Sequence, residues 1–267
     1  MEKLMEEKKT TLWQEIKICR VDETNYPHDL KKIKDRPEVL YYRGNIDILN
    51  EHKSIAVVGS RKISAVGAKL AYNAGSIIGK NGFNLVNGLA LGCDAEALKG
   101  ALAAGGKCAV VLPCGINEIY PKSNQWIAEE VLKQGGCLIS EYPEGTRPEK
   151  YRFVQRDRLQ SGMSQGVLVV EAMEKSGTMH TAEYAKKQNR RLACYYHGLL
   201  KYSTGNNVLE NLYQAAVIKT NEDLENYLCE IADIEEYTQL SFDFVYLFPH
   251  EKQKSSIVSR GDFYVLF

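Results

Sequence analysis

The chain has 267 residues, 44% of them apolar, and its 34 lysines and arginines are balanced by 34 aspartates and glutamates. This apolar fraction is typical of a globular protein and excludes a disordered one. A formal net charge of zero excludes a uniformly basic nucleic-acid binder, so any such site must be a local basic patch. Seven cysteines without a C-x-x-C pair are typical of a reduced protein that holds no zinc. With no signal peptide and no apolar run of about 18 residues, we expect a cytoplasmic protein that is not inserted in a membrane.

The first fifty residues or so predict one helix followed by irregular chain. Residues 1–20 are rich in charge and have a partial apolar face, which predicts an N-terminal amphipathic helix. Residues 21–50 contain Pro27 and Pro37, and a proline disfavours helix both at its own position and at the residue before it.

A regular alternation of short apolar runs and helical patterns begins at Ser54. Ser64 is placed to cap the first of these helices. Because the apolar runs are nearly continuous, both faces of each strand are expected to be buried, as in a parallel sheet. The sequence therefore predicts an α/β fold with a doubly wound, mostly parallel, Rossmann-like sheet. The predicted strands are 54–58, 83–86, 107–112, 136–140, 166–171 and 192–196, and the later helices lie near 95–104, 124–134, 181–188 and 208–213.

Three of the predicted strand ends carry residues that suit a phosphate, and ligands of an open α/β sheet bind at the carboxyl ends of its strands. Gly59-Ser60-Arg61 follows the first strand, where glycine lets the backbone approach a ligand and arginine offers phosphate two donors. The second turn contains Gly88 and Gly92, and the third is Ser176-Gly177-Thr178 at the start of a helix.

The sequence shows no catalytic constellation. Ser60 and Ser176 have no histidine beside them, and the five histidines show no catalytic or metal spacing. Asp94 is expected to cap its helix, and Glu171 either binds a ribose hydroxyl or orients its loop. The pattern indicates binding rather than turnover, so we predict no catalytic residue, no metal and no cofactor.

Residues 147–158 form a stretch with five cations and two aromatic side chains. Cations that follow phosphates and rings that stack on bases suit single-stranded nucleic acid. On composition alone, a solvated basic loop with core-facing aromatic residues is the simpler explanation. The five cations are Arg147, Lys150, Arg152, Arg156 and Arg158.

The segment over 229–267 has a different character. Residues 242–248 are strongly aromatic, and such a segment promotes aggregation when it is exposed. We therefore expect this tail to pack on the domain or on a second subunit.

Short motifs stand in a distinctive order between about Tyr26 and about Glu225. They are Tyr26-Pro27-x-x-Leu30, Pro37-x-x-Leu40-Tyr41, Ala56-Val57-Val58-Gly59-Ser60-Arg61, Gly88-Leu89-Ala90-Leu91-Gly92-x-Asp94, Tyr120-Pro121-x-x-Asn124, Ser140-Glu141-Tyr142-Pro143-x-Gly145, Arg156-x-Arg158, Val170-Glu171-Ala172 and Ser176-Gly177-Thr178. In these motifs the chain resembles the DprA/Smf family of DNA-processing proteins. The resemblance implies an extended Rossmann domain over 21–228, single-stranded DNA binding and a homodimer. It also implies a role in natural transformation and recombination, in which a RecA-type recombinase is loaded onto the bound DNA.

The same resemblance implies which residues contact DNA. The leading contacts are Ser60, Arg61, Arg156 and Arg158, and charge and position add Lys122, Arg147, Lys150 and Arg152. The sequence departs from the family pattern at Leu98, Val154 and Asp157, where histidine, proline and asparagine are usual. The charge of Asp157 is expected to weaken phosphate binding. Residues 1–20 and 229–267 are each too short for the helical and winged-helix domains that other members carry.

Two other functions remain open on the sequence. The three turns also suit a small nucleotide, as in a nucleotide-sensing or regulatory DprA-like protein of an antiphage or toxin–antitoxin system. A nucleotide phosphoribohydrolase with Glu171 as acid–base is the third hypothesis, although the Pro-Gly-Gly-x-Gly-Thr loop of such enzymes is absent.

Overall fold

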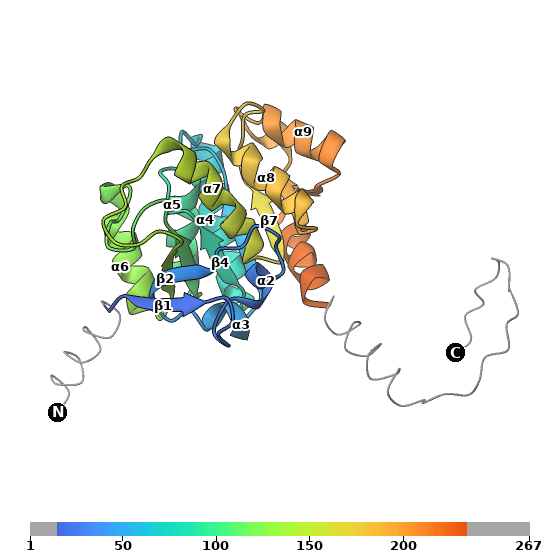
Figure 1. The fold of residues 1–267 in the computed structure, drawn as a ribbon. Coiled ribbons are helices and arrows are strands. Elements are labelled where there is room, and N and C mark those ends of the chain that lie inside the picture. Colours follow the sequence, from blue (N-terminus) through green and yellow to red (C-terminus); the bar gives the residue numbers. More distant parts are fainter. Residues whose placement is uncertain (1–14, 234–267) are drawn as a thin grey trace, which may run out of the picture. The chain divides into compact units, whose positions relative to one another are not determined.

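The computed structural model of the chain describes residues 15–233 (Figure 1). In that part of the chain, nine strands form one sheet in the order β1-β2-β6-β5-β4-β3-β7-β8-β9. The pairs from β6 to β9 are parallel, whereas β1 and β2 are antiparallel to their neighbours. The strands are β1 Lys17–Arg20, β2 Val39–Gly44, β3 Ser54–Val58, β4 Asn84–Asn87, β5 Cys108–Val111, β6 Cys137–Ser140, β7 Gly166–Val169, β8 Arg191–Tyr195 and β9 Ala216–Ile218.

Helices cover both faces of this sheet. None of those in the described residues is long and apolar enough to cross a membrane. They are α2 His28–Lys31, α3 Ile48–Glu51, α4 Ala65–Lys80, α5 Cys93–Ala103, α6 Gln125–Lys133, α7 Lys150–Gly162, α8 Gly177–Lys187 and α9 Thr204–Tyr213, with a further helix over 221–233 and short 3-10 turns η1 Lys122–Asn124 and η2 His197–Leu199.

The alternation of side chains along each strand divides the core into two layers. Ile55 and Val57 of β3 pack in one cluster with α4, α5 and α6. Ala56 and Val58 face the opposite way, toward α8 and α9. All of β3 is buried, which is the physical reason for its continuous apolar sequence. The predicted doubly wound, mostly parallel fold is thereby confirmed.

The prediction for the first fifty residues is wrong in part. Lys17–Arg20 is not the end of a helix but strand β1, which pairs with β2. Strand β2 lies in the region predicted to be irregular and joins β1 to β6. These two strands take their conformation from pairing with distant chain, which outweighs local helical spacing. The aromatic segment 242–248 and most of the predicted N-terminal helix lie outside the described residues.

The basic stretch 147–158 is also not the solvated loop that composition suggested. Most of it belongs to α7, which lies beside α8 (Figure 1). One side of α7 is buried, including Leu159 and Arg156. Because this helix has few apolar residues, a hydrophobic pattern does not reveal it.

Candidate nucleic-acid interface

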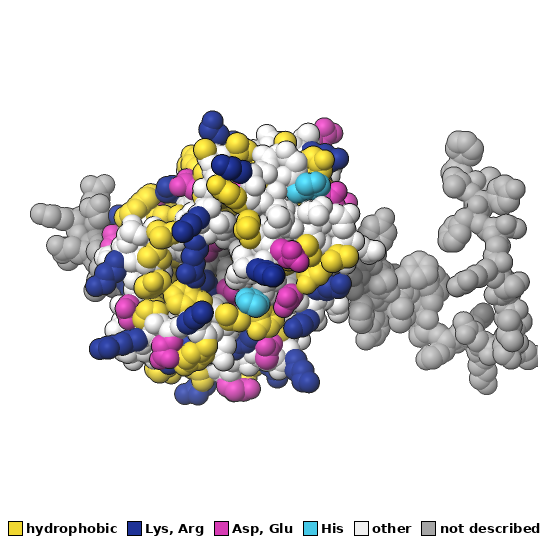
Figure 2. Space-filling view, turned by 90° about the horizontal axis from the view of Figure 1, so that it is seen from above, with side chains coloured by type: hydrophobic (Ala, Val, Ile, Leu, Met, Phe, Trp, Pro, Cys, Tyr) yellow, Lys and Arg dark blue, Asp and Glu magenta, His cyan; other side chains and the backbone are white. Residues whose placement is uncertain are grey.

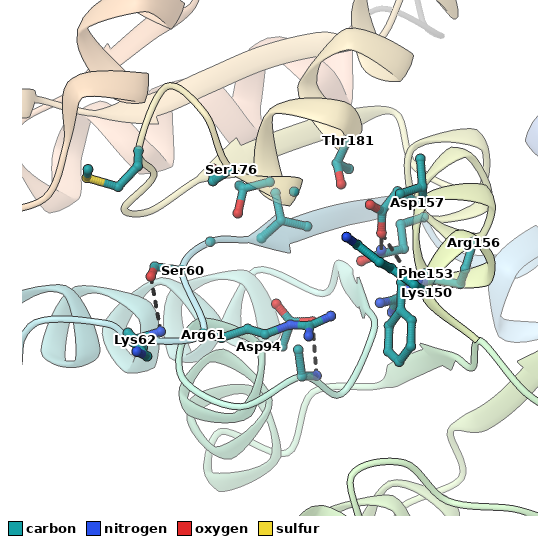
Figure 3. Close-up of a pocket in the computed structure, with 18 of the residues that line it drawn as sticks. Ser60, Arg61, Lys62, Asp94, Lys150, Phe153, Arg156, Asp157, Ser176 and Thr181 are labelled. Atoms are coloured by element: carbon teal, nitrogen blue, oxygen red, sulfur yellow. Dashed lines mark hydrogen bonds and ion pairs between the residues drawn. The ribbon is translucent and has the colours of Figure 1, made fainter. Parts of the chain in front are cut away.

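A cavity opens between the carboxyl ends of β3 and β7. The two strands are neighbours, but β3 continues into α4 on one face of the sheet and β7 leads to α8 on the other. This divergence is a topological switch point, where open α/β sheets bind ligands. The cavity has a volume of about 870 Å³, and its wall includes α7 (Figure 3).

The turn after β3 is held in place by backbone hydrogen bonds. The amide of Ser60 donates to the Glu171 carbonyl at 2.7 Å, and the Ser60 carbonyl accepts from the Cys93 amide at 3.1 Å. Ser64 caps α4 as predicted, since its hydroxyl accepts from the Gly67 amide at 3.0 Å. The turn is therefore fixed on both sides, which gives Ser60 and the residues after it a defined position.

Glu171 orients this region. One carboxylate oxygen accepts from the Ser64 amide at 2.7 Å and the other from the Tyr202 amide at 3.1 Å. The side chain is fully buried. Of the two roles considered for Glu171, the geometry favours orientation of the loops over contact with a ribose, and it gives no support to an acid–base role.

Gly92 is required where the second turn meets the first. Its φ is +76°, and a Cβ there would lie 2.5 Å from the Ser60 carbonyl oxygen.

We expect Gly92→Ala to lower the free energy of unfolding by about 2 kcal/mol or more and to weaken ligand binding by shifting the turn. Urea unfolding measures the first effect. Gly105→Ala is the matched control, because Gly105 has a φ of +74° but nothing within 4 Å of a Cβ. Equal losses in the two variants would contradict a role for the contact with Ser60.

Cations and aromatic rings lie together at this cavity. The Arg61 guanidinium stacks on the Phe153 ring at 4.9 Å, and the Tyr120 ring meets Phe153 edge-on at 5.4 Å. Lys62 and Lys150 also line the cavity, and within residues 15–233 neither they nor Arg61 form an ion pair. All three cations are exposed. Seen from above, lysine and arginine side chains gather with apolar side chains around a hollow (Figure 2).

The third predicted turn forms the opposite wall. Ser176 is the N-cap residue of α8, and Gly177 and Thr178 begin that helix. The Ser176 hydroxyl is buried and has no hydrogen-bond partner. A helix N-terminus presents free amide groups and a partial positive charge to an anion, so this wall suits a phosphate.

A buried cluster of charged residues forms part of the cavity wall. Arg156 is only 3% exposed, and its Nη1 donates to the Val111 carbonyl at 3.0 Å while its Nε lies 3.4 Å from Asp157 Oδ1. Asp94 is also buried, and its Oδ2 accepts from the amides of Gly88 and Ala90 at 3.0 and 3.2 Å. The expectation that Asp94 caps its helix is wrong, because Gly92 is the N-cap residue and Asp94 instead holds the second turn.

Gly88 makes room for this cluster. A Cβ at Gly88 would lie 1.2 Å from Arg156 Nη1, so only glycine allows the guanidinium to cross the second turn. Gly88 therefore leaves space for the buried Arg156 side chain. It does not line the cavity.

Burial shifts the acid–base properties of this cluster. It raises the pKa of Asp94, against the opposing effect of Arg156. It raises the pKa of Asp157 to about 6, again opposed by Arg156. Both carboxylates are therefore held at a cost in free energy when they are ionised.

Asp157→Asn is expected to stabilise the protein at neutral pH. The pKa of the Asp157 carboxyl is higher in the folded protein, at about 6, than in the unfolded chain, at about 4. The folded protein therefore loses stability as the pH rises from about 4 to about 6, because the carboxyl must ionise in a buried position. The variant removes this effect, so its gain should be about 3 kcal/mol near pH 7 and less than about 1 kcal/mol near pH 4. Urea unfolding at both pH values tests this, and a gain that does not depend on pH would contradict it.

The structure separates the predicted contacts into two groups. Those that line the cavity are Gly59, Ser60, Arg61, Lys150, Arg156, Ser176, Gly177 and Thr178. Gly88, Gly92, Lys122, Arg147, Arg152 and Arg158 do not line it. Arg158 is paired with Glu141 at 2.6 Å and Asp35 at 3.3 Å, and Arg152 is paired with Glu149 at 3.4 Å. Lys122 and Arg147 are exposed outside the cavity.

Sequence reasoning missed several residues of the cavity. Lys62 follows the first turn directly and could have been found from that position. Gln160 lies one helical turn after Asp157, so the helix alone places them on one face. Tyr202 and Met173 come from loops after β8 and β7, for which no sequence pattern gave a signal. All four line the cavity.

An open α/β sheet with cations, rings and a helix N-terminus at its switch point is typical of proteins that bind phosphate-bearing ligands. The family model described as DNA recombination-mediator protein A matches residues 17–228. The chain therefore belongs to this family of DNA-processing proteins, which includes DprA and Smf.

Individual relatives agree with this assignment. DNA processing protein DprA of Bacillus subtilis is 35% identical over 179 residues, which cover 67% of this chain and 60% of the relative. The structure of DprA from Streptococcus pneumoniae has a TM-score of 0.70 and 31% identity, over 81% of this chain and 76% of that one. The structure of DNA processing protein A from Helicobacter pylori, described for its single-stranded DNA binding mode, has a TM-score of 0.72 and 29% identity over 81% of this chain and 96% of that one. The chain spans about half the length of the curated relatives it matches.

Proposed function

We propose that this protein binds single-stranded DNA at the cavity and acts in recombination and natural transformation. The observation that carries the proposal is the stack of Arg61 on Phe153 at 4.9 Å, beside the exposed Lys62 and Lys150. This arrangement offers a strand both phosphate-binding charge and an aromatic platform.

The opposite wall complements this platform. The unpartnered Ser176 hydroxyl and the amides at the start of α8 can donate hydrogen bonds to a phosphate. A strand that crosses the cavity would then be held on one side by α8 and on the other by Arg61. Helicobacter pylori DNA processing protein A, which shares this fold, is described as binding single-stranded DNA.

Fluorescence anisotropy with labelled single strands of several lengths, at low and moderate salt, tests the proposal. We expect affinity that increases with strand length and falls with salt, because phosphate binding releases counterions. Absence of binding at low salt would overturn it. Saturable binding of a mononucleotide with no dependence on strand length would instead support the nucleotide-sensing alternative, which the cavity of about 870 Å³ also has room for.

We further propose that the protein acts as a homodimer and assists a RecA-type recombinase in loading onto the bound strand. The description of the matching family as a recombination mediator supports the second point, whereas the first rests on the resemblance to DprA/Smf proteins. Light scattering after gel filtration measures the first, and a monomer at all concentrations would contradict it. Recombinase ATPase activity on strands coated with single-strand-binding protein measures the second, and no stimulation would contradict it.

A further inference from the structure

The inner part of the cavity differs from its mouth in charge. The cations Arg61, Lys62 and Lys150 are exposed, whereas the carboxylate of Asp157 points into the cavity from α7 (Figure 3). Its Oδ1 accepts from Gln160 Nε2 at 2.9 Å and lies 3.4 Å from Arg156 Nε. A carboxylate has lone pairs for about four hydrogen bonds, so Asp157 retains free acceptor capacity on the cavity side.

A second acceptor lies next to it. Gln160 is 2% exposed and lines the cavity, and its Oε1 has no hydrogen-bond partner. A buried polar atom without a partner is rare in a folded protein and points to a ligand that completes it. Asp157 and Gln160 therefore place hydrogen-bond acceptors in the cavity wall, beside the Arg156 guanidinium that balances the charge of Asp157. These acceptors attract N–H donors.

We propose that the cavity selects guanine, whose N1–H and N2–H groups donate to the Asp157 carboxylate while the adjoining phosphate is bound at the mouth. This inference rests on the proposed function and specifies which base of the strand enters the cavity. Among the DNA bases, only guanine has two adjacent N–H donors on its Watson–Crick edge, and these match the two oxygens of one carboxylate.

The other bases fit this wall less well. Thymine has a single N–H that lies between two carbonyl oxygens. The partial negative charge of these oxygens would be repelled by the Asp157 carboxylate. Adenine and cytosine each offer one amino group beside an unprotonated ring nitrogen, so one carboxylate oxygen would meet an acceptor. Bases of single strands are commonly read on this edge. A well-placed two-bond contact discriminates between bases by about 1–3 kcal/mol, which corresponds to about 5- to 150-fold in affinity.

The test compares short oligothymidylates that carry one central guanine, hypoxanthine, adenine or cytosine. In anisotropy titrations with the full chain, we expect the guanine strand to bind at least about fivefold more tightly than the all-thymine strand. The hypoxanthine strand should be intermediate, since it keeps N1–H and lacks the N2 amino group. Equal affinity for all strands would overturn the guanine inference while leaving the proposed function intact, whereas no binding by any strand would overturn both.

Asp157→Asn distinguishes a direct contact from a general charge effect. It should abolish the preference for guanine and increase affinity for the all-thymine strand, because a negative charge is removed. The matched control is Asp22→Asn, the same chemical change at an exposed residue outside the cavity, which should retain the preference. A guanine preference that persists in Asp157→Asn would contradict the assignment to Asp157.

Discussion

Replacing Arg61 by alanine is expected to weaken single-stranded DNA binding by about tenfold or more without a large change in the free energy of unfolding. Arg61 is exposed and forms no ion pair with a described residue, so its removal leaves no buried charge behind. The variant loses one phosphate contact and uncovers one face of Phe153, on which the guanidinium lies at 4.9 Å. Loss of one contact should also reduce the slope of log affinity against log salt by about 0.7.

Two further variants make this measurement decisive. Arg61→Lys keeps the charge but loses the flat group that stacks on the ring, so it should retain the salt slope and recover only part of the affinity. Arg20→Ala removes an exposed arginine from edge strand β1, five strands away from β3 in the sheet, and should bind as the unmodified protein does. Unchanged affinity and slope in Arg61→Ala would contradict a strand at this cavity.

The sequence predicted the central sheet well because the relevant information is local. Strands such as β3 and β7 are buried on both faces, so their apolar runs are visible without knowledge of the fold. The cap at Ser64 and the turn after β3 also follow from short-range rules. Strands β1 and β2 could not be predicted in this way, since they depend on pairing with each other and with β6.

The candidate site was predicted less completely, because composition does not reveal which way a charged side chain points. Arg156 and Arg158 are two residues apart in one helix and therefore point in different directions. One is buried beside Asp157, and the other pairs with Glu141. Neither is a free cation, whereas Lys150 is exposed at the cavity. Only the helical phase of α7 and its packing distinguish these three residues.

This distinction leads to the second large effect, which is on stability. Arg156→Ala is expected to lower the free energy of unfolding by about 3 kcal/mol or more near pH 7, because removal of one partner leaves buried charge uncompensated. Asp94 and Asp157 would lose the cation that lowers the pKa of each. Their pKa values should therefore rise further, and part of the lost stability should return as the pH falls and the carboxyls become neutral.

Adding Asp157→Asn to Arg156→Ala is expected to restore part of the lost free energy of unfolding. In the double variant, one of the two uncompensated carboxylates is gone, so the loss of stability at neutral pH should be smaller than in Arg156→Ala alone. Urea unfolding of the single and double variants at two pH values gives the coupling between the two sites. If Arg156→Ala were as stable as the unmodified protein but failed to bind DNA, Arg156 would act as a ligand contact and not as the counter-charge of a buried acid pair. Loss of DNA binding by Arg156→Ala therefore indicates a contact only when the variant remains folded at the temperature of the titration.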